Sequence, residues 1–218
     1  MRLLEGFGEA RSLRVRAIAR KRGRGGFRYH AGRLSDANVM VLRHLQIVID
    51  ILLLRRGPQD LPAAWESLGF LGASYCFFSV CQMLIMADPG SAILHGLAAT
   101  LMLALFVHGL LRVRGRPERF VQTLSALYGV GIVIVLVLLG PTTVLAPFVE
   151  AMNSSPDTAA APPAPVVLAY LAGVIWSLIV SGHIYRHALD LGLAGGIAMA
   201  LLFEFLVFML FSLSGLGV

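Results

Sequence analysis

Long apolar runs alternate with short polar connections along most of this chain. Five runs reach about 20 residues each, the length that crosses the hydrocarbon core of a bilayer as an α-helix. We expect them at about 67–87, 92–111, 121–139, 166–185 and 194–216. The pattern therefore predicts an all-α polytopic membrane protein, with a bundle of five transmembrane helices in residues 61–218.

The connections carry turn-forming and helix-breaking residues. Residues 88–91, Asp-Pro-Gly-Ser, form a tight polar turn that makes a hairpin of the first two runs. Gly140-Pro141 is expected to kink or end the third run, with the apolar residues behind it continuing as a broken segment. A Pro- and Ala-rich loop over 150–165 and a short polar connection at 186–190 complete the map.

The segment before the bundle, residues 36–60, predicts an N-terminal interfacial amphipathic helix. Arg43, Gln46 and Asp50 recur at i, i+3 and i+7 and form one narrow polar stripe on an otherwise apolar helix. Only 11 residues separate Arg43 from Arg55, too few to span a membrane. The helix lies half sunk in the cytoplasmic leaflet, or it docks a partner protein.

Residues 1–35 contain ten Lys+Arg and are expected to form a basic cytoplasmic tail beside lipid headgroups. The stretch 21–33 is similar to an RGG-type RNA-binding patch, but we prefer the lipid-facing reading and expect no nucleic-acid partner. The first residues contain no apolar core and no cleavage site, so no secretory signal peptide is expected. The expected contacts with anionic headgroups are Arg11, Arg14, Arg20, Lys21, Arg22, Arg112, Arg114 and Arg116.

Composition and charge agree with a membrane protein and orient it. The chain is 57% hydrophobic and 14% charged, whereas soluble domains average about 25% charged residues. The segments 1–65, 112–120 and 186–190 hold 13, 4 and 1 of the 18 Lys+Arg, and all three fall on one side of the alternating map. The positive-inside rule then predicts a multi-pass protein of the cell inner (plasma) membrane, with its N-terminus cytoplasmic and its C-terminus outside.

The fifth run contains one ionisable residue, Glu204. A carboxylate near the bilayer centre costs about 2.5–3.5 kcal/mol on insertion scales, so it marks a candidate functional site. Glu204 lies about 16 Å along its run at 1.5 Å per residue. Ser79, Thr100 and Trp176 reach a comparable depth on the same count. Glu204 is expected either to be protonated and hydrogen-bonded to such a neighbour, to handle a proton or cation, or to pair with another subunit's helix.

The histidines give a second candidate site. His108, His183 and His187 are all expected near the inner surface, where they could bind a metal with Asp190 or Glu118. A b-type haem between His108 and His183, with His95 as ligand of a second haem, is the other reading. Ordinary interfacial histidines are the interpretation we favour, so no cofactor is expected.

The chain lacks H-E-x-x-H, G-x-S-x-G and Walker A motifs, and it has no G-x-G-x-x-G that opens a dinucleotide-binding unit. Cys76 and Cys81 point about 140° apart on a helix and are not expected to pair. The sequence therefore predicts a protein that is not an enzyme.

Trp176 and the stretch YRHALDLGLAGGIAMAL, residues 185–201, carry a family resemblance. An aromatic-bearing fourth span turns through a short Gly-containing loop into a final, Ala-rich span. Residues 61–218 thereby resemble the bacterial branch of the Yip (Ypt-interacting protein) five-span membrane family. The resemblance implies the topology and a non-enzymatic role, and it assigns no functional residues.

Together these patterns predict a non-enzymatic integral membrane protein, an adaptor or assembly subunit of a membrane complex. Its expected partners are the lipid bilayer and a protein subunit. A small proton- or cation-coupled transporter or channel that uses Glu204 is the alternative. A haem- or metal-binding redox subunit is the third hypothesis.

Overall fold

The computed structural model describes residues 42–157 and 160–213, and the chain divides into two units. The first unit is Met1–Gln46, in which the described residues, 42–46, are helical. The basic tail expected over 1–35, with Arg11, Arg14, Arg20, Lys21 and Arg22, lies outside the described residues. The second unit, Ile47–Val218, carries all the features described below.

The second unit is built from helices. Residues 47–52 end the helix that starts in the first unit, and a short 3-10 helix, η1 (Pro58–Asp60), follows. The long elements are α2 (Trp65–Met83), α3 (Pro89–Val113), α4 (Phe120–Ser154), α5 (Ala164–Leu189) and α6 (Leu193–Leu213), with η2 (Pro117–Arg119) before α4. Within the described ranges the chain has six α-helices and no strand, which confirms the predicted all-α class.

Four helices of the described part are long and apolar enough to cross a membrane. They are Pro89–Val113, Pro117–Ser154, Ala164–Leu189 and Leu193–Ser212, and they match four of the five expected runs. The first expected run, 67–87, is also helical as α2, but α2 is not among the four. Its 19 residues include Glu66, Tyr75 and Gln82, which lower its mean hydropathy.

The third run does not stop at Gly140-Pro141. α4 continues through Pro141 and Pro147 to Ser154, so the broken continuation becomes part of one long helix. Proline removes one backbone donor and crowds the preceding turn. The Thr143 hydroxyl donates to the Gly140 carbonyl oxygen at 2.7 Å. α4 thus runs 13 residues past the boundary that the proline indicated, although most of this extension is exposed.

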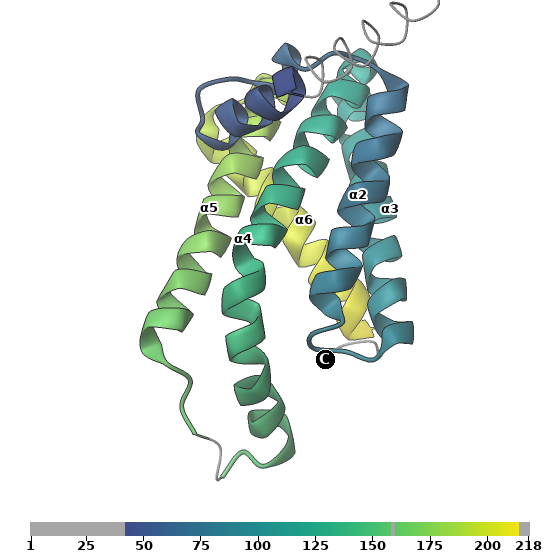
Figure 1. Cartoon of the computed structure of the whole chain (residues 1–218). Helices are drawn as coiled ribbons and strands as arrows, with labels where there is room; N and C mark the ends of the chain where they lie inside the picture. Colours follow the sequence, from purple (N-terminus) through teal and green to yellow (C-terminus); the bar gives the residue numbers. More distant parts are fainter. Residues whose placement is uncertain (1–41, 158–159, 214–218) are drawn as a thin grey trace, which may run out of the picture. The chain divides into compact units, whose positions relative to one another are not determined.

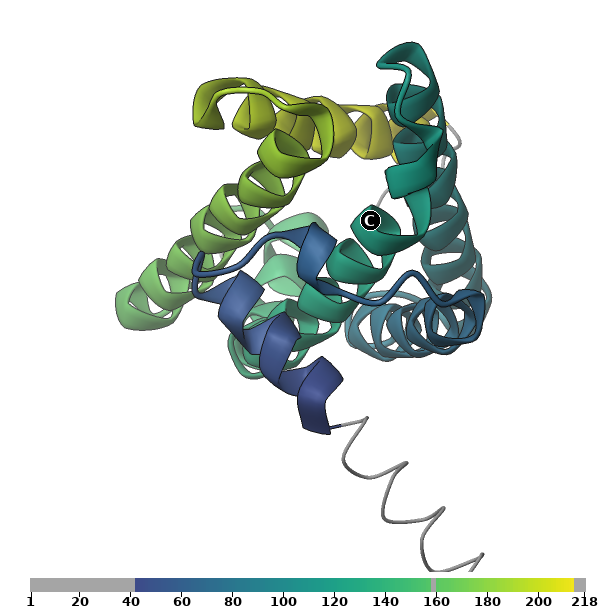
Figure 2. The same cartoon turned by 90° about the horizontal axis from the view of Figure 1, so that it is seen from above.

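Glycines allow pairs of helices to approach closely. α6 crosses α5 where Gly182 meets Gly196 and Ile197, so backbone lies against backbone. On the other side of α4, Tyr75 of α2 stacks on Tyr128 at 5.2 Å between ring centroids, and its ring lies against Gly131. Figures 1 and 2 show α6 running obliquely past α5 toward α3, whereas α2 and α3 run side by side.

The short helix before η1 packs on the bundle. Ile47, Val48 and Ile51 are buried, and Val48 lies against Gly129 of α4. Asp50 forms an ion pair with Arg56 at 3.3 Å. Part of the apolar side that we expected to face lipid is therefore covered by protein. The interfacial position of this helix stays a prediction.

Candidate functional site

Glu204 lines a partly open cavity to which five helices contribute residues. The cavity has a volume of about 130 Å³. Polar side chains reach it from three elements: Tyr75 of α2, Ser177, Ser181 and Tyr185 of α5, and Glu204 of α6. α3 and α4 contribute apolar residues, among them Leu103, Leu127 and Ile134. The residue that stood out in the sequence therefore lies in a polar cluster within otherwise apolar helices.

Tyr185 is the most informative neighbour of Glu204. It is only 2% exposed, and its hydroxyl has no hydrogen-bond partner in the described part of the chain. A buried hydroxyl without a partner costs about 1–3 kcal/mol. The neighbouring Ser177 is satisfied, because its hydroxyl donates to the Val174 carbonyl oxygen at 2.8 Å. Tyr185 thus adds a buried hydroxyl without a hydrogen-bond partner to the residues that line the cavity.

Helical periodicity explains how α5 presents this cluster. Ser177, Ser181 and Tyr185 follow each other at intervals of four residues, which places them on one face of the helix. Four-residue spacing of polar residues in an apolar run is visible in the sequence. This signal identifies three cavity residues that a count of depth along each run does not.

The expected neighbours of Glu204 lie elsewhere. Ser79 lies one helical turn after Tyr75 on α2. The Thr100 hydroxyl donates to the Gly96 carbonyl oxygen at 2.7 Å, and Trp176 is 38% exposed. None of these three is among the residues that line the cavity. Counting depth at 1.5 Å per residue along each run assumes that the helices are parallel, whereas α6 is inclined to its neighbours (Figure 1).

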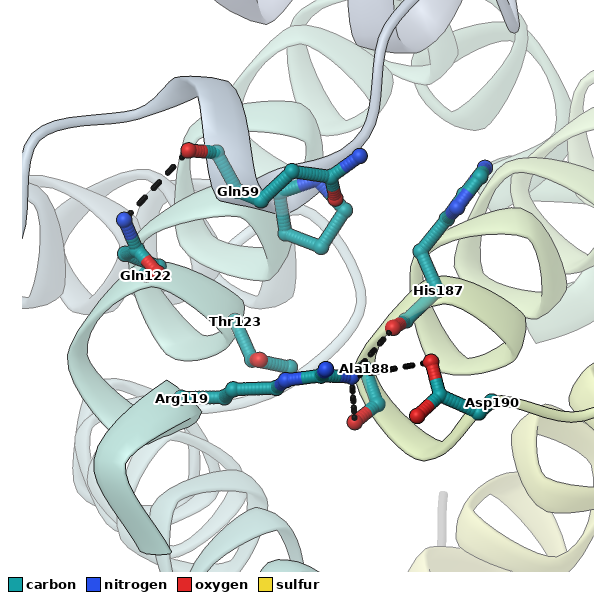
Figure 3. Close-up of a pocket in the computed structure, with 8 residues that line it drawn as sticks. Gln59, Arg119, Gln122, Thr123, His187, Ala188 and Asp190 are labelled. Carbon is teal, nitrogen blue, oxygen red and sulfur yellow. Dashed lines mark hydrogen bonds and ion pairs between the residues drawn. The ribbon is translucent and has the colours of Figure 1, made fainter. Parts of the chain in front are cut away.

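A second polar cluster holds the C-terminal end of α5. Arg119 donates to the carbonyl oxygens of His187, at 2.9 Å, and Ala188, at 3.1 Å. Arg114 donates to the Leu189 carbonyl oxygen at 3.1 Å, while the Leu191 amide donates to Arg186. All four terminal carbonyls of α5 are thereby satisfied. Figure 3 shows the Arg119 guanidinium reaching from the end of η2, just before α4, to these carbonyls and to Asp190.

Asp190 completes this arginine cluster, which we define as Arg114, Arg116, Arg119 and Asp190. Its carboxylate pairs with Arg116 and, at 3.1 Å, with Arg119. The residue itself has a left-handed backbone with φ 52°. The positive charges also suit the negative end of the α5 dipole. The cluster thus ties the connection between α3 and α4 to the C-terminal end of α5 at one end of the bundle.

The pH dependence of this cluster follows from Asp190. The hydrogen bond from Arg119, with the charges of Arg116 and Arg114, holds the pKa of Asp190 below its usual value. Its contribution to stability is therefore complete above the unfolded pKa, about 3.9, and is lost as the pH falls through the folded-state pKa. We expect Asp190→Asn to lower Tm by an amount that is constant from about pH 5 to 8 and shrinks only below about pH 4.

The measurement is thermal unfolding of both proteins in detergent across this pH range. Asparagine tolerates the left-handed backbone at 190, so the substitution removes the charge without adding strain. A Tm difference that already vanished between pH 5 and 7 would show that another group controls the cluster.

A pocket of about 290 Å³ lies beside the arginine cluster. It is lined by Gln59, Arg119, Gln122, Thr123, His187 and Asp190, together with Pro58 and Ala188 (Figure 3). Gln122 donates to the Leu61 carbonyl oxygen at 2.8 Å and so fixes the η1 segment over α4. Thr123 is 1% exposed, and its hydroxyl has no hydrogen-bond partner among the described residues.

The three histidines of the metal or haem hypothesis lie on two helices. His108 of α3 packs edge-on against Phe120 at 5.4 Å between ring centroids. His183 and His187 of α5 have their centroids 4.7 Å apart, and the His183 Nε2 atom bonds to the Arg56 carbonyl oxygen at 2.9 Å. Within the described residues no group of three or more His, Cys, Asp or Glu could hold a metal ion.

The arginines predicted to touch lipid headgroups differ in their surroundings. Arg114 and Arg116 make the contacts with α5 and Asp190 described above. Arg112 is exposed in the last turn of α3. Arg114 and Arg116 therefore help to hold the end of α5, whereas Arg112 faces outward.

The fold defines a class: an all-α chain in whose described part four helices are suited to cross a membrane. No protein-family model matches the chain, and the comparisons with curated proteins and with solved structures find no match. The function is therefore inferred from the geometry of the site alone.

Proposed function

We propose that this protein is an integral membrane protein that takes up a proton or a small cation at Glu204, as part of coupled transport. The single observation that carries the proposal is the cavity in which the Glu204 carboxyl shares a wall with the unpartnered Tyr185 hydroxyl. Ionisable residues at such depth are rare and commonly line ion or proton pathways. Three further hydroxyl groups, from Tyr75, Ser177 and Ser181, line the same space.

The proposal includes five spans, with α2 as the fifth. α2 packs against both α3 and α4, which supports a position inside the bundle. One end of the bundle then carries the arginine cluster, and the other carries Asp88, Glu150 and Asp157. We place the basic end in the cytoplasm and the C-terminus outside, because positive loops are retained on that side.

Replacing Glu204 with glutamine tests the function. The full chain is reconstituted into liposomes that contain a pH-sensitive dye, and internal pH is followed after a pH jump and after Na⁺ or K⁺ gradients. We expect the wild type to transport at a rate above that of protein-free liposomes. Glu204→Gln should return the rate to the protein-free level, because glutamine keeps the shape and hydrogen bonds but cannot titrate.

The matched control is Glu150→Gln, which neutralises an exposed carboxylate near the end of α4. It should transport as the wild type does. Both variants are first compared with the wild type by gel filtration and Tm. Unchanged transport in Glu204→Gln would refute the proposal, and a large loss of Tm in that variant alone would assign Glu204 to packing instead.

An adaptor or assembly subunit is the second candidate. The observation in its favour is that Glu204 is exposed on α6 as well as lining the cavity, so a helix of another subunit could cover it. The resemblance to the Yip family and the non-enzymatic role belong to this hypothesis. Purification in mild detergent followed by native mass spectrometry distinguishes the candidates, since only the adaptor requires a stoichiometric partner.

A further inference from the structure

The pocket at the arginine cluster and the Glu204 cavity lie along the same pair of helices. Thr123 of α4 lines the pocket, and Leu127, one turn further, lines the cavity. On α5, Ala188 lines the pocket and Tyr185, just under one turn away, lines the cavity. One turn of helix advances about 5.4 Å. The two spaces are therefore successive along the α4–α5 seam, by which we mean the contact between residues 123–138 and 173–188.

Two buried hydroxyls lie on this seam, one on a residue that lines the pocket and one on a residue that lines the cavity. Thr123 and Tyr185 are 1% and 2% exposed, and neither hydroxyl has a hydrogen-bond partner among the described residues. A hydroxyl both donates and accepts, so it can pass a proton when water completes the chain. Buried waters typically occupy such sites beside otherwise unsatisfied polar groups.

The seam is apolar on the other side of the cavity. Leu138 of α4 is buried, and its side chain fills the space above Gly173 of α5. Val135 lines the cavity wall just before it. This stretch offers no hydroxyl to a proton, so the polarity of the seam differs between its two ends.

We propose that the α4–α5 seam is a one-sided aqueous path that carries protons from the pocket at the arginine cluster, past Thr123 and Tyr185, to Glu204. This inference rests on the proposed function, because Glu204 is the end point of the path. It adds the identity of the coupling ion and the side of the membrane from which that ion enters. The titratable groups that face Glu204 are the phenols of Tyr75 on α2 and Tyr185 on α5, while α3 and α4 present apolar side chains there. Arg119, His187 and Asp190 stand at the entrance.

Cysteine accessibility tests the path without measuring transport. In the full chain with Cys76 and Cys81 replaced by serine, Ser181→Cys places a thiol on the cavity wall. A small, membrane-impermeant methanethiosulfonate is added to one side of sealed vesicles, and labelling is counted by mass spectrometry. Glu118→Cys and Asn153→Cys, both at exposed positions, report the basic end and the opposite end.

We expect Ser181→Cys to be labelled only when the reagent is on the side that labels Glu118→Cys. Ile175 of α5 is 57% exposed, and Ile175→Cys is the matched control. It should stay unlabelled from both sides, because a thiol in lipid does not ionise. Labelling from the Asn153 side, or from neither side, would overturn the path. These outcomes do not depend on Glu204, so they are distinct from a failure of Glu204→Gln to abolish transport.

The identity of the ion has its own test in the liposome assay. Glu204-dependent flux should persist when Na⁺ and K⁺ are replaced by an impermeant organic cation. Tyr185→Phe, which removes only the hydroxyl, should slow it by about 100-fold or more, the usual range for a missing proton-transfer group. Flux that required Na⁺ or K⁺, or that was unchanged in Tyr185→Phe, would refute the proton path.

Discussion

Replacing Gly196 with alanine is expected to separate α6 from α5 and leave little folded protein. An added Cβ atom would lie 2.9 Å from the Arg186 backbone nitrogen and 3.0 Å from the Gly182 carbonyl carbon, and closer still to the Gly182 oxygen. Backbone atoms cannot rotate away as side chains do. Overpacking typically costs about 1–3 kcal/mol, and this contact belongs at or above the upper end of that range.

The experiment compares the yield of monodisperse protein and its Tm in detergent for Gly196→Ala and the wild type. Gly109→Ala is the matched control, because an added Cβ there meets nothing within 4 Å in the middle of a helix. Alanine favours a helix over glycine by about 1 kcal/mol, so the control should keep or raise the Tm. Equal Tm values for Gly196→Ala and the wild type would show that α6 does not pack on α5 in this way.

Removing the Arg119 side chain is expected to lower stability by about 2–3 kcal/mol, the usual range for hydrogen bonds that involve a charged group. Arg119→Ala would leave the carbonyls of His187 and Ala188 without their donor and Asp190 with one arginine fewer. Since these contacts join η2, just before α4, to the end of α5, the loss should appear as a lower Tm. Arg119→Lys should recover only part of it, because a lysine cannot present the same fork of donors.

Arg112→Ala is the matched control for Arg119→Ala. Arg112 lies near the same end of the bundle, in the last turn of α3, and is exposed. Its loss should change the free energy of unfolding by less than about 0.5 kcal/mol, so Tm should stay close to that of the wild type. If both alanine variants unfolded at the same temperature, the arginine cluster would have no special role in holding α5.

The local features of the chain were largely readable from the sequence. The helices from α3 to α6 lie where the apolar runs predicted them, because burial in an apolar medium obliges each run to satisfy its own backbone. Glu204 was identified because a lone carboxylate stands out in an apolar run. The full length of α4 was not, because Pro141 is a local helix-breaking signal and α4 nevertheless continues through it to Ser154.

The neighbours of Glu204 and the role of the arginines required the structure. Arg114 and Arg119 bind carbonyls 75 and 68 residues further along the chain. No local pattern connects positions so distant. The sequence predicted that Arg114, Arg116 and Arg119 lie on the same side as residues 186–190, but their spacing did not reveal that they hold the end of α5.

The sequence by itself determined that this is an all-helical chain with long apolar helices, one of which carries a single carboxylate. Hydrophobicity and helical period act within each segment, so these features need no partner to be recognised. Only the tertiary structure decided what the carboxylate faces. The crossing of α6 over α5 depends on Gly182 and Gly196, and this crossing, rather than depth along the sequence, places Tyr185 and Ser181 beside Glu204.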